Sequence, residues 1–359
     1  MGVIAAKFGG SSAADAAGFR RISQIISQSD QRRIIVLSAP GSAAGLQEKM
    51  TELLERCWQR RRHGLPTIDL VERAARRYDG IARELGLPSI RGDVRREIRR
   101  ALRCGEADVL SRGESLCAAL FSRYTGIPVL DAAQLIAFDE NGEPDEPRTL
   151  RRIERAAREN DRFILPGFYG AMPDGSIATF PRNGSDITGA LAAAGANAAL
   201  YENWTDVPGL MTADPGIVPG ARLIPQISYR QMRRLARAGA QVLHPECLDP
   251  VASAGIPTRL RSTLRPECFG TLIDDRCGGT VPCVAVRTLS EEEDVQEGFL
   301  RSAGVACATA FGLDAPRVAA AAEAVRPLRV SEERDEARFY VPAECAQAAV
   351  RRLHAFLPG

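Results

Sequence analysis

The chain has 359 residues, 45% of them hydrophobic and 26% charged, and its 47 basic and 45 acidic side chains give a formal net charge of +2. This composition is typical of a globular protein of about two domains and excludes a disordered chain or a small disulfide-stapled scaffold. The near-zero charge argues against nucleic-acid binding, and a cytoplasmic protein is expected because the sequence has neither an apolar stretch of roughly 18 residues nor a charged leader.

Predicted strands and helices alternate through the first three quarters of the chain. Short apolar runs predict buried strands at 3–8, 34–37, 127–130, 163–165, 198–204 and 258–261. Amphipathic patterns predict helices at 46–61, 67–85, 91–103, 106–124, 149–159, 228–238 and 245–254, with further helices after the first strand and from Gly184 onward. This alternation predicts an α/β fold with three layers, α/β/α, and a mostly parallel sheet in a domain at 1–275.

A linker is predicted at 274–282, where Gly278 and Gly279 interrupt the pattern. Beyond it, apolar runs at 284–286, 306–310 and 337–341 predict strands, and a helix is expected at 315–325 and again at the C-terminal end. These elements predict a small α+β domain at 282–359.

Cysteines and histidines give no sign of a metal centre. The nine cysteines are scattered and never spaced as CxxC, so reduced thiols are expected. The three histidines are too few and too dispersed for a metal cluster or a supported Ser/His/Asp triad. No metal-binding residue is therefore predicted.

Lysine is rare in this chain, since only Lys7 and Lys49 among the 47 basic residues are lysines. A lysine retained in so arginine-rich a chain suggests a site that needs a compact ammonium group, although chance is sufficient for Lys49 alone. Lys7 ends the first predicted strand just before Gly9 and Gly10. A glycine turn between a strand and a helix can direct backbone N–H groups at a phosphate.

A second glycine turn places charged residues around the start of a predicted helix, at 182–186. Taken singly, its Asn, Ser or Asp is best explained as a helix cap. Together, Arg182 can hold a carboxylate through two hydrogen bonds while Asp186 meets an ammonium group. That pairing describes an amino-acid substrate.

Eight motifs, in order along residues 1–275, resemble those of the aspartate kinases of the amino-acid kinase family. They are KFGGSS at 7–12, SAPG at 38–41, KMTELL at 49–54, SRGE at 111–114, PGFYG at 166–170, RNGSD at 182–186, WTDVPG with TADP at 204–215, and VLHP at 242–245. The resemblance implies the amino-acid kinase fold and transfer of the γ-phosphoryl group of ATP to the β-carboxylate of L-aspartate. This is the first step of lysine, threonine and methionine biosynthesis.

The resemblance also implies residue roles. Lys7 and Asp186 are the catalytic candidates, with Lys7 on the transferring phosphoryl group and Asp186 orienting Lys7 or the substrate. The substrate contacts are Thr51, Glu114, Arg182 and Ser185, with Arg182 on the α-carboxylate and Glu114 on the ammonium group. The nucleotide contacts are Lys7, Gly9, Gly10, Ser11, Thr205, Asp206, Met211 and Gln241. Mg²⁺ is expected to bridge the β- and γ-phosphates, held largely by phosphates and water.

Four departures from the family pattern lie mainly on the nucleotide side. Gln241 replaces a lysine, Met211 replaces an aromatic residue, and Pro181 and Asn183 replace glycines, which should reduce backbone freedom. They leave open a second hypothesis, a catalytically weak or inactive aspartokinase-like protein that binds an amino acid or regulates a partner. A related kinase for another acid is disfavoured by the KFGG and RGE motifs together.

The C-terminal region is short for this family. Residues 331–357 resemble the last strand and helix of an ACT module, and about 75 residues after the linker are enough for one module rather than the usual two. We therefore expect a homodimer with weak or absent inhibition by lysine and threonine. The alternative is that two chains pair their single modules and rebuild the effector site.

Overall fold

A computed structural model describes residues 2–42, 48–181, 183–240, 245–297, 299 and 304–358 of the chain. The chain divides into two compact units. Unit 1 comprises Met1–Pro208 and Glu246–Cys268, and unit 2 comprises Gly209–Pro245 and Phe269–Gly359.

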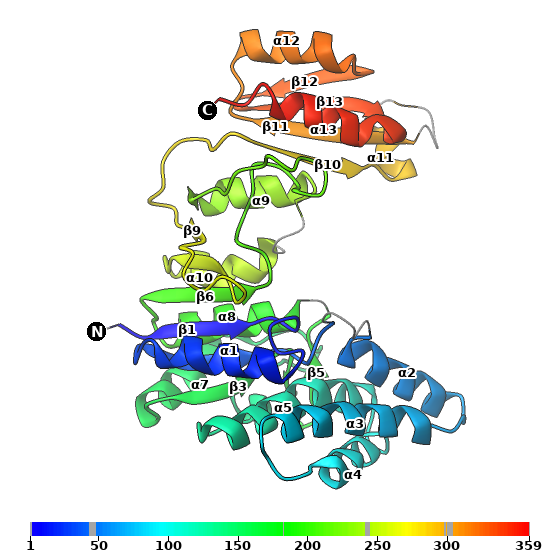
Figure 1. The fold of residues 1–359 in the computed structure, drawn as a ribbon, viewed down its shortest axis with the longest axis vertical. Helices are drawn as coiled ribbons and strands as arrows, with labels where there is room; N and C mark the ends of the chain where they lie inside the picture. Colours follow the sequence, from blue (N-terminus) through cyan, green and yellow to red (C-terminus); the bar gives the residue numbers. More distant parts are fainter. Residues whose placement is uncertain are drawn as a thin grey trace. The chain divides into compact units, whose positions relative to one another are not determined.

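Unit 1 is built on parallel strands in the order β3-β2-β1-β6-β8 (Figure 1). Their bounds are β1 Ile4–Phe8, β2 Arg32–Leu37, β3 Phe163–Pro166, β6 Leu200–Thr205 and β8 Thr258–Ser262. The central strands β1 and β2 are almost wholly buried. Strands covered on both faces read as continuous apolar runs, which is why the sequence predicts them well.

Helices cover both faces of this sheet. One apolar core joins the sheet to α1 (Ala16–Ser27), α2 (Met50–Arg62), α3 (Ile68–Glu84), α4 (Arg91–Ala101) and α5 (Glu106–Thr125). The other layer contains α7 (Glu146–Glu159), α8 (Gly184–Gly195) and α10 (Asp249–Ser253). Because neighbouring residues of a strand face opposite sides, Ala6 and Phe8 join the first core and Lys7 faces α8.

A buried charge cluster lies beside the central strand β1. Both carboxylate oxygens of Glu202 accept hydrogen bonds from Arg32, at 2.7 and 3.1 Å, and Oε2 also accepts from the indole nitrogen of Trp204 at 3.0 Å. Arg261 adds a second cation at 3.3 Å. Burial alone would raise the pKa of Glu202, but the hydrogen bonds and charge of Arg32 lower it below its ordinary value. Trp204 in turn stacks on Phe8 at the end of β1.

Unit 2 contains a four-stranded antiparallel sheet in the order β10-β11-β13-β12. Its strands are β10 Cys283–Thr288, β11 Val305–Phe311, β12 Arg329–Glu333 and β13 Glu336–Pro342. Helices α12 (Ala315–Val325) and α13 (Ala346–His354) pack on one face of the sheet. The unit also holds α9 (Tyr229–Arg237), α11 (Glu291–Gln296) and a parallel pair of short strands, β7 (Gln226–Ile227) and β9 (Thr271–Ile273).

The predicted fold class is confirmed: a three-layer α/β/α arrangement on a mostly parallel sheet, with a smaller α+β region after it. The division into domains at 1–275 and 282–359 stays a prediction. The compact units have other boundaries, because residues 209–245 group with the C-terminal sheet rather than with the strands that precede them.

Two predicted elements take another form. Residues 127–130 do not form a strand; Val129 makes a single bridge to Ile164, and Pro128 has no N–H to extend the pairing. The helix predicted at 245–254 is a 3-10 turn, η1 (Pro245–Leu248), followed by α10, and Pro250 in the first turn of α10 favours this new start.

Several short elements are absent from the prediction. They are α6 (Ala132–Leu135), the hairpin β4 (Tyr169–Ala171) with β5 (Ile177–Thr179), the strands β7, β9 and β12, the helix α11 and the 3-10 turn η2 (Ala343–Cys345). Each has six residues or fewer, which is too short for a periodic apolar pattern to mark it. No helix in the described ranges is long and apolar enough to cross a membrane.

Candidate active site

Six of the predicted site residues line one cavity of unit 1, with a volume of about 320 Å³. They are Lys7, Gly10, Thr51, Glu114, Ser185 and Asp186. The cavity lies where β1 and β2 end and α8 begins. In open α/β sheets the carboxyl ends of the strands are the usual place for a ligand.

Lys7 forms a buried ion pair at the centre of this site. Its Nζ lies 2.6 Å from Oδ1 of Asp186, and the lysine is only 7% exposed. Asn203 donates to the same Oδ1 at 2.7 Å, from the position on β6 that is paired with Lys7 on β1. Two donors from neighbouring strands therefore fix the carboxylate, and the carboxylate fixes the ammonium group.

Asn203 is a site residue that the sequence reasoning missed. It is a buried polar residue within the strand β6, and its amide also donates to the hydroxyl of Tyr201 at 3.2 Å. The signal was present, because a polar side chain in an otherwise buried strand needs a partner. Only the strand register, which places it beside Lys7, identifies that partner.

The two glycine turns after β1 and β2 pack directly against each other. The N–H of Gly41 donates to the carbonyl of Gly10 at 2.8 Å. A Cβ on Gly10 would lie 2.8 Å from the carbonyl oxygen of Ala39, and one on Gly41 would lie 2.6 Å from the carbonyl carbon of Gly10. Such close approach of two backbones requires glycine on both sides.

The N–H of Gly9 is not available for the phosphate contact predicted for it. Its N–H donates to the carbonyl of Trp204 at 3.0 Å and so continues the strand pairing instead of facing a phosphate. The N–H of Gly10 has no acceptor within the part of the chain that the structure describes. Of the two glycines, Gly10 is the one that can offer an N–H group to a ligand.

Glu114 is buried in α5 at 3% exposure and lines the same cavity as Lys7. Burial raises the pKa of its carboxyl group to about 8, although the backbone of Ala39 partly opposes this by hydrogen bonding to it. Its Oε2 atom has no hydrogen-bond partner among the described residues. A buried carboxyl oxygen without a partner, facing a cavity, is arranged to receive a cationic group.

The start of α8 depends on unusual backbone conformations. Asn183 caps the helix with φ of 50°, and Phe168 in the facing turn has φ of 77°. Asparagine is one of the few residues enriched in this left-handed region. Asn183 thus adopts a conformation that the glycine of the family pattern would also favour, and the predicted loss of backbone freedom stays a prediction. Close packing continues at Gly167, where a Cβ would lie 2.6 Å from the hydroxyl oxygen of Ser185.

The remaining nucleotide candidates are spread along the chain. Ser11 follows Gly10 in the first turn, and Thr205 donates to Asp206 at 3.1 Å where β6 ends, all in unit 1. Met211 belongs to unit 2, where it bridges to Leu223. Arg182 and Gln241 lie outside the described residues, so their roles remain predictions.

The segment that follows Met211 packs into the C-terminal part of unit 2. Thr212 accepts from the backbone of Val284 at 2.7 Å and its hydroxyl lies 2.9 Å from Nε2 of His354 in α13. Ala213 and Val218 belong to the apolar core under the antiparallel sheet. The segment predicted to border the nucleotide is thus part of the C-terminal core.

The amino acid kinase family matches residues 2–262, which is most of the chain. The chain belongs to this family. Its sequence is 33% identical over 302 residues to aspartokinase 3 of Bacillus subtilis, which covers 79% of this chain and 66% of that protein. It is 30% identical over 297 residues to lysine-sensitive aspartokinase 3 of Escherichia coli, covering 76% and 64% of the two chains. The chain thus spans just under two thirds of the length of these family members.

Solved structures agree with this family membership. The aspartate kinase of Clostridium acetobutylicum has a TM-score of 0.89 and 26% identity, over 99% of this chain and 100% of that one. Aspartokinase III of E. coli in complex with aspartate and ADP has a TM-score of 0.79 over 99% of both chains, and at 22% identity it shows the fold alone. The resemblance to aspartate kinases drawn from the motifs is confirmed.

Proposed function

We propose that this member of the amino acid kinase family is an aspartate kinase, which transfers the γ-phosphoryl group of ATP to the β-carboxylate of L-aspartate. One observation carries the proposal. A buried ammonium group held by Asp186 and a buried carboxyl group of Glu114 with an unpartnered oxygen line the same cavity. A site that offers both a cation and an anion suits an amino acid next to a phosphate, and the relatives named aspartokinases support the assignment.

The reaction needs positioning more than proton transfer. A substrate carboxyl group with a pKa near 3.9 is already an anion at neutral pH, so no general base has to activate it. Lys7 neutralises charge on the phosphoryl group as it moves, and Gly10, which lines the same cavity, offers an N–H group without an acceptor among the described residues. Asp186, fixed by Asn203, keeps the ammonium group of Lys7 in place. Preorganised charge of this kind is the largest contribution in phosphoryl transfer.

The amino-acid end of the substrate is assigned to the other wall of the cavity. Glu114 binds the ammonium group, and Thr51 and Ser185 lie close enough to the same space to serve as hydrogen-bond partners. Arg182 is assigned to the α-carboxylate from the sequence motif. Binding an ammonium group also favours the ionised form of Glu114, so substrate binding and loss of a proton from this buried carboxyl are coupled.

ATP and Mg²⁺ complete the proposal. No group of three or more His, Cys, Asp or Glu side chains that could hold a metal ion occurs within the described ranges. Oδ1 of Asp186 is already engaged by Lys7 and Asn203. These residues fit an ion that is held mainly by the β- and γ-phosphates and water, where it would neutralise phosphate charge.

A second candidate function is a catalytically weak or inactive protein that binds an amino acid or regulates a partner. Gln241 and Met211, which replace a lysine and an aromatic residue of the family pattern, favour it. Hydroxylamine trapping separates the two, because an acyl phosphate yields a hydroxamate. Aspartate, ATP and Mg²⁺ should give hydroxamate well above a control without aspartate. No hydroxamate, together with a melting temperature that aspartate still raises, would favour the second function.

We further propose a homodimer in which lysine and threonine inhibit weakly or not at all. The described C-terminal residues form one four-stranded sheet, which supports one ACT-like module, whereas an effector site of paired modules needs two. The contact of Thr212 with His354, at 2.9 Å, supports a route from such a module to the nucleotide segment if an effector did bind. Light scattering gives the oligomeric state, and strong cooperative inhibition by millimolar lysine or threonine would overturn the regulatory part.

A further inference from the structure

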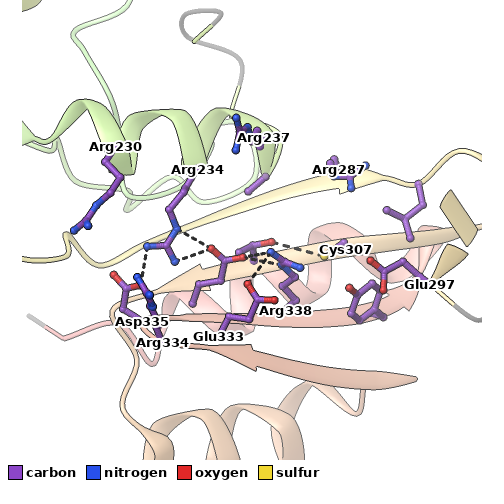
Figure 2. A pocket seen from close by; sticks show the side chains of 15 residues that line it. Arg230, Arg234, Arg237, Arg287, Glu297, Cys307, Glu333, Arg334, Asp335 and Arg338 are labelled. Atoms are coloured by element: carbon purple, nitrogen blue, oxygen red, sulfur yellow. Dashed lines mark hydrogen bonds and ion pairs between the residues drawn. The ribbon is translucent and has the colours of Figure 1, made fainter. Parts of the chain in front are cut away.

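A cavity with a volume of about 790 Å³ lies within unit 2 (Figure 2). Cys307, Thr309 and Tyr340 form its floor, on the face of the antiparallel sheet opposite α12 and α13. Helix α9 and the loop between β12 and β13 line its sides. The volume lies within the range of about 300–1,000 Å³ that is usual for small-molecule sites. All the lining residues belong to unit 2, whereas those of the candidate active site all belong to unit 1.

Arginines converge on this cavity from both sides. Arg230, Arg234 and Arg237 are spaced i, i+4 and i+7 on α9, so they share one face of the helix. The sheet and its loops contribute Arg287, Arg334 and Arg338. Four carboxylates also line the cavity, which leaves six cations against four anions.

All four carboxylates already have arginine partners. Glu336 lies 2.7 Å from Arg234 and 2.6 Å from Arg338. Asp335 lies 2.7 Å from Arg234, and its other oxygen accepts from the hydroxyl of Thr280. The other two pairs are Glu333 with Arg338 and Glu297 with Arg329.

Three of the lining arginines have no such partner. Arg230, Arg237 and Arg334 form no ion pair with any residue that the structure describes. Guanidinium groups that line a cavity without a carboxylate raise the local positive potential and leave forked donors free. An anionic ligand would satisfy them.

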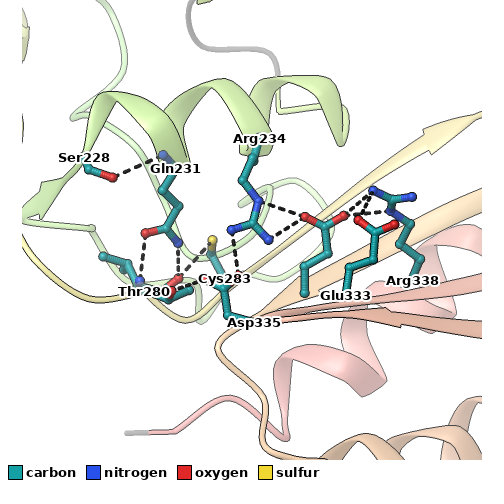
Figure 3. Close-up of polar contacts among 10 residues, drawn as sticks. Ser228, Gln231, Arg234, Thr280, Cys283, Glu333, Asp335 and Arg338 are labelled. Atoms are coloured by element: carbon teal, nitrogen blue, oxygen red, sulfur yellow. Dashed lines mark hydrogen bonds and ion pairs between the residues drawn. The ribbon is translucent and has the colours of Figure 1, made fainter. Parts of the chain in front are cut away.

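The arginine-bearing helix is firmly attached, so the cavity is preformed. The side-chain amide of Gln231 donates to the carbonyl of Val281 at 2.6 Å and accepts from its N–H at 2.9 Å (Figure 3). Ser228 caps the helix by accepting from the backbone of Gln231 at 3.2 Å. Arg234 anchors the middle of α9 to Glu336 and lies over the ring of Phe311. The helix backbone that carries Arg230 and Arg237 is therefore held in place before a ligand binds, which lowers the cost of ordering the site.

We propose that this cavity binds a small organic molecule that carries two or more oxyanion groups, carboxylate or phosphate. The unpaired arginines on α9 and on the β12–β13 loop each match one such group through paired hydrogen bonds. A single inorganic ion would fill only a small part of 790 Å³. The paired residues Arg234, Asp335 and Glu336 form the fixed wall of the site rather than its ligand contacts.

The test is isothermal titration calorimetry of the full chain with citrate and with pyrophosphate, at about 0.15 M salt to screen surface charge. We expect at least one probe to bind with one site per chain, and the probe that binds identifies a carboxylate or a phosphate ligand. The double variant Arg230→Gln/Arg237→Gln should weaken that binding by roughly tenfold or more. Arg334→Gln, on the exposed loop, should also weaken binding, and it provides an independent measurement if the double variant folds poorly.

A matched control removes the same charge elsewhere. Arg151 and Arg155 are exposed on α7 in unit 1 and line no part of the cavity. Arg151→Gln/Arg155→Gln and Lys7→Ala should leave binding unchanged. Failure of both probes to bind below about 5 mM, equal loss in the α7 variant, or loss in Lys7→Ala would overturn the proposal. The measured quantity is binding rather than turnover, so failure of the proposed enzyme activity would not affect the outcome.

Discussion

Replacing Glu114 by glutamine should stabilise the substrate-free protein while it weakens aspartate binding. The carboxyl group is buried, one of its oxygens has no partner among the described residues, and burial raises its pKa from 4.5 to about 8. A folded-state pKa above the unfolded value means that stability falls as pH rises from about 4.5 to 8, because the folded state holds the proton more tightly. Above that range, ionisation of the buried carboxyl group lowers the free energy of unfolding by about 5 kcal/mol. At pH 7 it lowers that free energy by at most about 3 kcal/mol.

Glutamine keeps the shape of the side chain and removes the ionisation. Urea unfolding at pH 7 should therefore show Glu114→Gln more stable than the wild type by up to about 3 kcal/mol, and the difference should shrink to about 1 kcal/mol at pH 5. Glu106→Gln is the control, since Glu106 is exposed on the same helix and should change stability by about 0.5 kcal/mol or less at either pH. A Glu114→Gln variant that is no more stable, or whose advantage is the same at both pH values, would refute the reasoning.

Three further predictions concern backbone packing, the buried charge cluster and the nucleotide side. Gly10→Ala should destabilise the protein by about 1–3 kcal/mol in urea unfolding, because the added Cβ would lie 2.8 Å from a backbone carbonyl oxygen. Gly80→Ala is the control: its Cβ would have no heavy atom within 4 Å, so it should stabilise the protein by about 0.5–1 kcal/mol. Glu202→Gln should lower stability by about 3–5 kcal/mol at pH 7 by leaving Arg32 buried and unpaired. Since Arg32 lowers the pKa of Glu202, this difference should shrink as pH falls below 4.5 and through the lowered pKa of the folded state, and persistence of the full difference throughout an acid titration would contradict it. Gln241→Lys should lower the Michaelis constant for ATP, because a charge-assisted contact contributes about 1.5–3 kcal/mol, and an unchanged constant in steady-state kinetics would count against this role.

The fold could be predicted where burial leaves a periodic signal. The strands β1 and β2 are covered on both faces and read as continuous apolar runs. Edge elements give no such signal: β12 reads Arg-Val-Ser-Glu-Glu, and only its pairing with β13 defines it as a strand. Periodicity also could not show that 209–245 would group with the C-terminal sheet, since that depends on contacts far apart in the sequence.

Residues of the candidate site could be predicted from the sequence where they belong to recognisable motifs. The sequence identified Lys7, Glu114 and Asp186, and the structure brings these residues to one cavity. It did not identify Asn203, because the pairing of β1 with β6 that places it there is a long-range contact. Nor could it show that strand pairing uses the N–H of Gly9, which leaves Gly10 as the available donor.

The most direct test of the proposed mechanism compares hydroxamate formation by the wild type with that by Lys7→Arg. Arginine keeps the positive charge, but its planar group cannot occupy the space of an ammonium group held 2.6 Å from Asp186. With aspartate, ATP and Mg²⁺ at saturation, the wild type should form hydroxamate and Lys7→Arg should be slower by a factor of about 10² or more, while aspartate still raises its melting temperature. Equal rates for the two proteins, or no hydroxamate from the wild type, would contradict the account.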